Sequence, residues 1–190
     1  DAMTKDFGWN DGVNRLYTTL AQDFVYKDAT RNVIFLDNHD IARFYSVVNE
    51  NMDKYLSSLT WLLTSRGIPQ VYYGDEIATP GTTSPNDGHV RLDFPGGWKN
   101  DPLNKFTIQG RSQTDQAIFQ HFATLANFRK TSSALTIGKL MQYLPEDGVY
   151  VYFRYSNNQT VMVVMNTSKE EKTVSPGKYT ERVEGFTKSR

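Results

Sequence analysis

Hydrophobic positions in the first two thirds of the chain follow two patterns, helical spacing and short unbroken runs. Apolar residues recur every three or four positions over Val13–Phe24, Met52–Ser65 and Asp115–Lys130, which predicts three helices. Residues 32–36 and 68–73 are short, mostly apolar runs, as expected of strands buried on both faces of a parallel sheet. The order helix, strand, helix, strand predicts a parallel α/β arrangement.

Both predicted strands end in polar clusters. Asp37-Asn38-His39-Asp40 follows the first run, and Gly74-Asp75-Glu76 follows the second. Sites in open parallel sheets lie at the carboxyl ends of strands, so these clusters are the candidate chemistry. Residues 78–104, in which Gly and Pro recur, are expected to form a long loop of the kind that is often functional.

After Ser133 the apolar pattern changes from helical spacing to alternation. Odd positions of 149–155 are expected on one face of a strand, and even positions on the other. The sequence therefore predicts two domains, residues 1–133 and 134–190, with an antiparallel β-domain as the second. Strands are expected at 139–144, 149–155, 161–165, 172–174 and 179–183.

Composition narrows the functional classes. The chain has 21 basic and 21 acidic residues and no run of Lys and Arg, so nothing points to nucleic acid as a partner. No apolar window is long enough for a membrane-spanning helix, and the first residues lack the apolar core of a signal peptide. The absence of cysteine excludes disulfides and thiol chemistry but leaves the compartment open.

The Asp37–Asp40 cluster allows several chemical interpretations. A carboxylate at a strand end can stabilise positive charge, act as an acid or base, or ligate a metal. Asp and Asn equally cap helices and turns. A metal site is disfavoured because strand alternation sends Asp37 and His39 to one face and Asp40 elsewhere, and no second ligand pair has a convincing spacing.

Two segments carry a resemblance to a known family. Phe35-Leu36-Asp37-Asn38-His39-Asp40 resembles the fourth sequence signature of the α-amylase family, which lies at the end of the seventh barrel strand. Residues 67–76, Gly-Ile-Pro-Gln-Val-Tyr-Tyr-Gly-Asp-Glu, resemble the family's eighth-strand segment, and a helix of suitable length separates the two. The terminal β-domain is similar to the domain that follows the barrel in these enzymes.

The resemblance implies a fold and a set of site residues. The expected fold is the C-terminal part of a (β/α)8 TIM barrel followed by an incomplete antiparallel β-sandwich. Asp40 matches the carboxylate that stabilises the transition state, and His39 matches the imidazole that hydrogen-bonds the sugar. Arg43 follows the motif and is expected in the substrate-binding site. Arg91 is a further candidate, although Val90-Arg91-Leu92-Asp93 departs from the family form.

The resemblance also implies what this chain lacks. The family's nucleophilic Asp and acid Glu follow the fourth and fifth barrel strands, and their signatures have no match here. Because retaining glycoside cleavage needs both groups, we expect a chain that is inactive alone although its parent is a retaining glycoside hydrolase acting on starch, maltodextrins or cyclodextrins. No cofactor is expected, and a calcium ion, common among amylases, would draw its ligands from other segments.

Further expectations concern partners and location. Strands taken out of a barrel expose unpaired edges, which predicts self-association. A periplasmic or extracellular location is favoured over a cytoplasmic one. Two other classes compete with the hydrolase: a non-catalytic carbohydrate-binding or interaction module with exposed Tyr, and a small α/β metal hydrolase. Linkage preference, and hydrolysis as opposed to transglycosylation, depend on segments outside this sequence.

Overall fold

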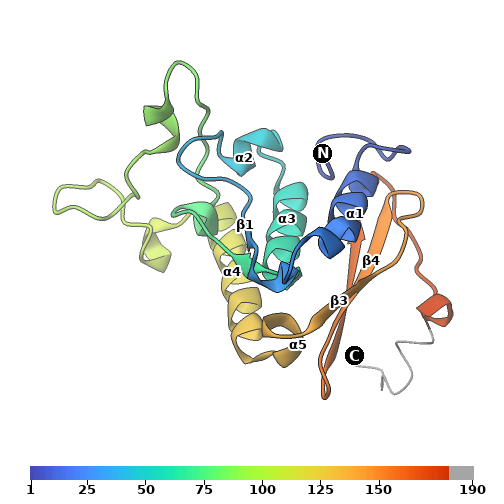
Figure 1. Cartoon of the computed structure of the whole chain (residues 1–190). Coiled ribbons are helices and arrows are strands. Elements are labelled where there is room, and N and C mark those ends of the chain that lie inside the picture. Colours follow the sequence, from blue (N-terminus) through green and yellow to red (C-terminus); the bar gives the residue numbers. More distant parts are fainter. Residues whose placement is uncertain (180–190) are drawn as a thin grey trace.

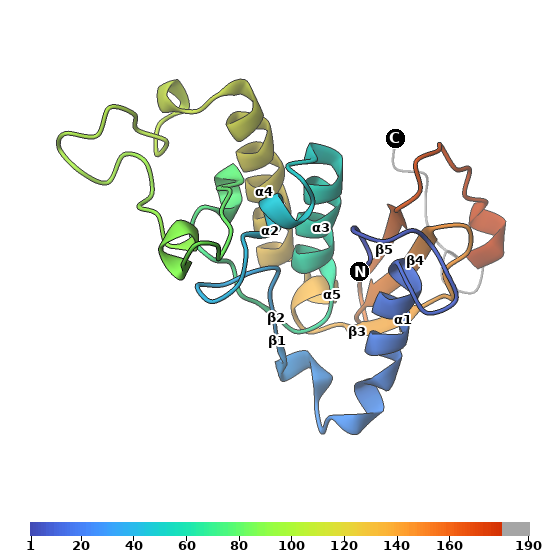
Figure 2. The same cartoon turned by 90° about the horizontal axis from the view of Figure 1, so that it is seen from above.

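Helices account for more residues than strands in the computed structural model, which describes residues 1–179. α3 and α4 lie side by side, and α1 lies next to the C-terminal sheet (Figure 1 and Figure 2). The helices are α1 (Val13–Ala21), α2 (Phe44–Val47), α3 (Met52–Thr64), α4 (Gln113–Thr131) and α5 (Ser133–Thr136).

The two longest helices begin at side-chain caps. The Asn51 side chain accepts a hydrogen bond from the Lys54 N–H at the start of α3 (3.0 Å). At the start of α4, Ser112 and Asp115 form a reciprocal capping box, which satisfies N–H groups that have no partner within the helix. The three predicted helices are confirmed, although α1 ends at Ala21 and continues as a 3-10 turn over Gln22–Val25.

The parallel pair is shorter and more exposed than predicted. β1 (Val33–Ile34) and β2 (Ile68–Pro69) pair in parallel, with Val33 opposite Ile68. Val33, Phe35 and Ile68 are exposed, so the expectation of strands buried on both faces is wrong for this chain. No described element covers that outer face, and these three side chains are the surface on which the predicted self-association would depend.

The C-terminal sheet has three antiparallel strands in the order β3–β4–β5. They are β3 (Lys139–Gln142), β4 (Val149–Tyr155) and β5 (Thr160–Asn166). The predicted alternation in β4 is confirmed: Tyr150 and Tyr152 pack into one core cluster, and Val151 and Phe153 into another.

The last two predicted strands fare differently. No strand forms at 172–174, where the prediction is wrong; Val174 instead packs against the second cluster from a segment without regular structure. Of the strand predicted at 179–183, Tyr179 lies in the 3-10 turn Pro176–Tyr179, and the other four positions lie outside the described residues.

One hydrophobic core joins the helices to the sheet. It contains Val13 of α1, Leu59 of α3, Ile118 of α4 and Tyr150 and Met165 of the sheet. Because residues from both sides share this cluster, the division at 133/134 stays a prediction.

A buried arginine on β4 also ties the sheet to the helices. Arg154 Nη1 donates to the Thr64 and Ser65 carbonyls at the end of α3, and Nη2 donates to the carbonyls of Leu135 and Gly138. Helix ends leave such carbonyls without partners inside the helix, and Arg154 supplies donors to them; the Ser65 carbonyl also accepts from Arg129 Nη1 (3.1 Å).

A long segment between β2 and α4 extends away from the helices (Figure 1). It contains three short 3-10 turns, η3 (Asp75–Ile77), η4 (Asp87–Val90) and η5 (Ile108–Gly110), and the predicted loop at 78–104 lies within it. Within residues 1–179, no helix has the length and apolar character needed to cross a membrane.

Candidate functional site

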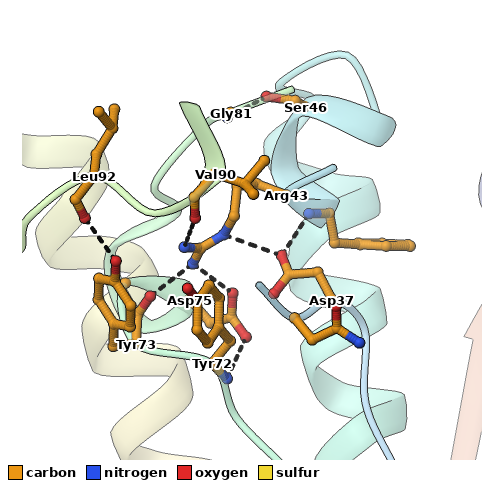
Figure 3. A network of polar contacts seen from close by, with 12 residues as sticks. Asp37, Arg43, Ser46, Tyr72, Tyr73, Asp75, Gly81, Val90 and Leu92 are labelled. Carbon is orange, nitrogen blue, oxygen red and sulfur yellow. Dashed lines mark hydrogen bonds and ion pairs between the residues drawn. The ribbon is translucent and has the colours of Figure 1, made fainter. Parts of the chain in front are cut away.

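A buried arginine joins the ends of the two parallel strands. The Arg43 guanidinium lies between two buried carboxylates, with Nε 3.3 Å from Asp37 Oδ2 and Nη2 3.1 Å from Asp75 Oδ1 (Figure 3). All three side chains are almost completely removed from solvent. Because Asp37 follows β1 and Asp75 follows β2, Arg43 holds the two strand ends together.

Backbone carbonyls and an aromatic ring complete the surroundings of Arg43. Its Nη2 donates to the Tyr73 carbonyl (2.7 Å) and its Nη1 to the Val90 carbonyl (3.5 Å) (Figure 3). The guanidinium carbon lies 4.5 Å from the centre of the Tyr72 ring, within cation–π range. These contacts place the loop that carries Val90 against the strand ends.

The carboxylates are fixed by backbone donors as well. Asp37 Oδ2 accepts the Phe44 N–H at the start of α2 (2.6 Å), and Asp75 Oδ2 accepts the Tyr72 N–H (3.1 Å). The pKa of Asp75 is raised to about 8: burial is the largest cause, the neighbouring charge of Asp37 adds to it, and Arg43 opposes both. The cluster therefore holds one more proton at neutral pH than two ordinary carboxyls would.

Beside this network lies a second, solvent-exposed cluster. Arg91 Nη2 lies 3.2 Å from Asp40 Oδ1 and 3.2 Å from Asp87 Oδ2, and Arg91 Nε donates to the His39 carbonyl (2.9 Å). His39 Nε2 lies 3.3 Å from Asp40 Oδ1. The Asp40 and His39 side chains are each 62% exposed and that of Arg91 is 45% exposed, so a ligand can reach all three.

The structure thus brings three of the four predicted site residues into direct contact. Asp40 lies in a loop, where Asn38 Oδ1 accepts its N–H (2.8 Å), and not on a solvent-facing helix. The fourth, Arg43, has no exposed side-chain surface for a ligand to reach, and it pairs with Asp37 at the other end of the loop that carries Asp40 and His39.

Two residues of the network carried little signal in the sequence. Asp75 belongs to Gly74-Asp75-Glu76, which is also a common strand-to-loop turn, and only the fold shows that it pairs with Arg43. Tyr73 donates from its hydroxyl to the Leu92 carbonyl (2.9 Å), a contact that no local pattern predicts. Among the described residues, no group of three or more acidic or histidine side chains could hold a metal ion.

Two family models match successive parts of the chain. The model "Alpha amylase, catalytic domain" matches residues 9–102, which include both clusters described above. The model "Cyclo-malto-dextrinase C-terminal domain" matches residues 140–190, from the start of the sheet onward. The fold and these matches define part of a (β/α)8-barrel catalytic domain joined to an antiparallel β-domain.

Individual relatives agree with the family models. A cyclomaltodextrin glucanotransferase of Bacillus sp. (strain 1-1) is 29% identical over 167 residues, which is 88% of this chain and 21% of that protein. An alpha-amylase of Niallia circulans is 30% identical over 155 residues, covering 82% of this chain and 25% of that protein. The chain belongs to the α-amylase family, and it spans about a fifth to a quarter of the length of these two relatives.

Solved structures show the same fold. The crystal structure of CldA, a cyclomaltodextrin glucanotransferase with three domains, superimposes with a TM-score of 0.66 at 28% identity, over 87% of this chain and 30% of that one. An alpha-amylase from Geobacillus thermoleovorans, complexed with acarbose, gives a TM-score of 0.68 over 89% of this chain and 34% of that one. At 23% identity, the second comparison supports the fold alone.

Proposed function

We propose that this chain supplies one wall of the sugar-cleaving site of an α-amylase-type glycoside hydrolase or transferase that acts on α-glucans. The observation that carries the proposal is the contact of Asp40, His39 and Arg91 in an exposed cluster. The cluster lies within the part of the chain that matches the catalytic-domain model. The relatives' names, which include cyclomaltodextrin glucanotransferase, alpha-amylase and 4-alpha-glucanotransferase, support α-glucans as the substrate class.

The chemistry of glycoside cleavage suits these groups. Positive charge develops on the sugar ring in the transition state, and the Asp40 carboxylate would stabilise it. His39 would donate a hydrogen bond to a hydroxyl of the same sugar. Arg91, held between Asp40 and Asp87, would fix the direction of the Asp40 carboxylate.

Arg43 would act through the loop. The loop segment from Asp37 to Arg43 is fixed at both ends by the buried ion pair, and Asp40 and His39 lie between these ends. A carboxylate held in place before the sugar binds needs no reorganisation during the reaction. We therefore assign Arg43 and its partners Asp37 and Asp75 a positioning role.

The proposal includes inactivity of the 190-residue chain by itself. Retaining cleavage needs a nucleophile and an acid on carboxyl groups about 5 Å apart, in addition to a stabilising carboxylate. The clusters at the two strand ends offer no such free pair: Asp37 and Asp75 are buried against Arg43, and Asp40 is engaged by Arg91. The nucleophile and acid would come from segments outside this sequence.

A binding and turnover experiment on the purified chain tests the proposal. We expect maltoheptaose or acarbose to shift the His39 imidazole signal in NMR spectra and leave those of His89 and His121 in place, with no release of reducing ends. Asp40→Asn should weaken binding about tenfold, because a charged hydrogen-bonding group is lost. Asp53→Asn, which removes an exposed carboxylate at the start of α3, is the matched control.

Three outcomes would contradict the proposal. The absence of any His39 shift would remove the sugar site from this cluster. Sugar binding that Asp40→Asn and Asp53→Asn leave unchanged would favour a carbohydrate-binding module with another site. Robust turnover by the chain would overturn the inactivity.

A further inference from the structure

The loop that follows Arg91 carries large apolar side chains on its surface. Trp98 is 68% exposed and Phe106 is 61% exposed, and the exposed side chains of this loop also include Leu92, Leu103 and Ile108. Single exposed apolar residues need no explanation, but a loop that exposes several of them is a candidate binding surface.

Trp98 stands on a backbone that is fixed on both sides. Asp101 Oδ2 accepts the N–H groups of Gly96 (2.9 Å) and Trp98 (3.0 Å), and the Asp101 N–H donates to the Trp98 carbonyl (3.2 Å). The Lys105 N–H donates to the Pro95 carbonyl (2.9 Å) and closes the loop. Compact loops of this kind, closed by their own contacts, are frequently functional.

The loop is also attached to α4. Lys105 Nζ lies 2.8 Å from Asp115 Oδ2, and the Arg111 guanidinium lies 3.6 Å from the centre of the Phe119 ring. Gly96 has a positive φ of 111°, and a Cβ there would lie 2.4 Å from Asn104 Oδ1, so glycine is required. The exposed rings therefore belong to a loop that is held against α4 by specific contacts.

This loop is continuous with the candidate site. Arg91 contacts Asp40, and the carbonyl of the next residue, Leu92, accepts the hydrogen bond from the Tyr73 hydroxyl. Tyr73 in turn offers its carbonyl to Arg43. A polymer with one sugar unit at Asp40 has further units on either side, and the surface that begins at Leu92 adjoins that place.

We propose that Trp98 and Phe106 form a platform that binds glucose units of an α-glucan chain beyond the unit held at Asp40. The platform rests on the proposed function for its substrate class. A pyranose ring has an apolar C–H face and a polar rim, and an exposed indole offers a large rigid surface at low cost in conformational entropy. Phe106 packs against Phe94, with ring centres 4.4 Å apart, and keeps its remaining surface open.

The chain contains its own control for this idea. It has three tryptophans, and Trp9 is 90% exposed, so Trp9→Ala and Trp98→Ala both remove an exposed indole. In an NMR titration with maltoheptaose, we expect the indole N–H signal of Trp98 to shift and that of Trp9 to stay. In a gel containing soluble starch, we expect Trp98→Ala to lower affinity about tenfold, Trp98→Phe to restore part of it, and Trp9→Ala to behave as the unchanged chain.

The readouts separate this inference from the proposed function. A His39 shift with a silent Trp98 would overturn the platform and leave the function in place. A Trp98 shift with a silent His39 would support the platform and count against the site at Asp40. A Trp98 signal that moves with protein concentration and not with sugar would show that the loop binds a second copy, which overturns the platform.

Discussion

The buried carboxyl of Asp75 predicts an unusual dependence of stability on pH. Its pKa in the folded chain is raised to about 8, first by burial and then by the charge of Asp37. A carboxyl with a raised pKa stabilises the fold below its unfolded pKa and loses that contribution as pH rises through the folded value. We therefore expect the free energy of unfolding to fall between about pH 4 and pH 8.

Because only one group titrates, the change in the free energy of unfolding has an upper limit. A single group changes stability by at most about 1.4 kcal/mol per pH unit, and the whole window is worth on the order of 5 kcal/mol. Asp75→Asn removes the titrating group and keeps an acceptor for Arg43. It loses the acceptor for the Tyr72 N–H, which adds a roughly constant cost of about 1–3 kcal/mol.

Urea unfolding of both proteins at several pH values from 5 to 8.5 measures this difference. We expect the stability of the original chain relative to Asp75→Asn to fall by about 1.4 kcal/mol per pH unit, so that the variant becomes the more stable protein before pH 8. Asp115→Asn is the control: burial alone would raise the pKa of Asp115, but hydrogen bonds from Lys105 and Ser112 outweigh it and lower that pKa. Asp115→Asn should therefore lower stability by a constant amount between pH 5 and pH 8.5, with a cost that shrinks only at more acid pH. Parallel curves for Asp75→Asn and the original chain would refute the reasoning.

Two further changes test the packing. Arg154→Met should lower the free energy of unfolding by about 3–5 kcal/mol in urea, because four backbone carbonyls between α3 and the sheet lose a buried charged donor. A loss below about 1 kcal/mol would mean that these carbonyls find other partners. Ser112→Ala should lower the free energy of unfolding by about 1 kcal/mol, because the α4 capping box is lost. Ser57→Ala, on α3, should change stability little, and equal losses for the two variants would contradict the role of the cap.

The sequence predicted best those elements whose cause is local. The helix expected at Met52–Ser65 is observed at Met52–Thr64, because apolar spacing and an Asn51 cap both lie within the segment. The two parallel strands are only two residues long, since regular pairing depends on neighbours, and within residues 1–179 β1 pairs with β2 alone. At 172–174 the predicted strand did not form, and Val174 makes its apolar contacts from a segment without regular structure.

The site was predictable only in part for the same reason. Family resemblance proposed Asp40 and His39 as site residues, and the structure brings Arg91 to them from a distant segment of the chain. The ion pair of Arg43 with Asp75 joins residues 32 positions apart, and its meaning depends on burial, which spacing cannot show. A buried charge is visible only once the surrounding elements are placed.

The buried ion pairs of Arg43 and the exposed cluster at Asp40 are connected by one loop. Asp37 and Arg43 are buried and Asp40 is exposed, although all three belong to one short loop. An exposed carboxylate on a free loop would need to be ordered each time a sugar binds, at a cost of about 1–2 kcal/mol per residue fixed. Holding the loop by buried charges removes that cost during binding and transfers it to folding. The fall in stability predicted between about pH 4 and pH 8 is the measurable sign of that transfer, because Asp75, the second carboxyl that helps to hold Arg43, is difficult to ionise where it is buried.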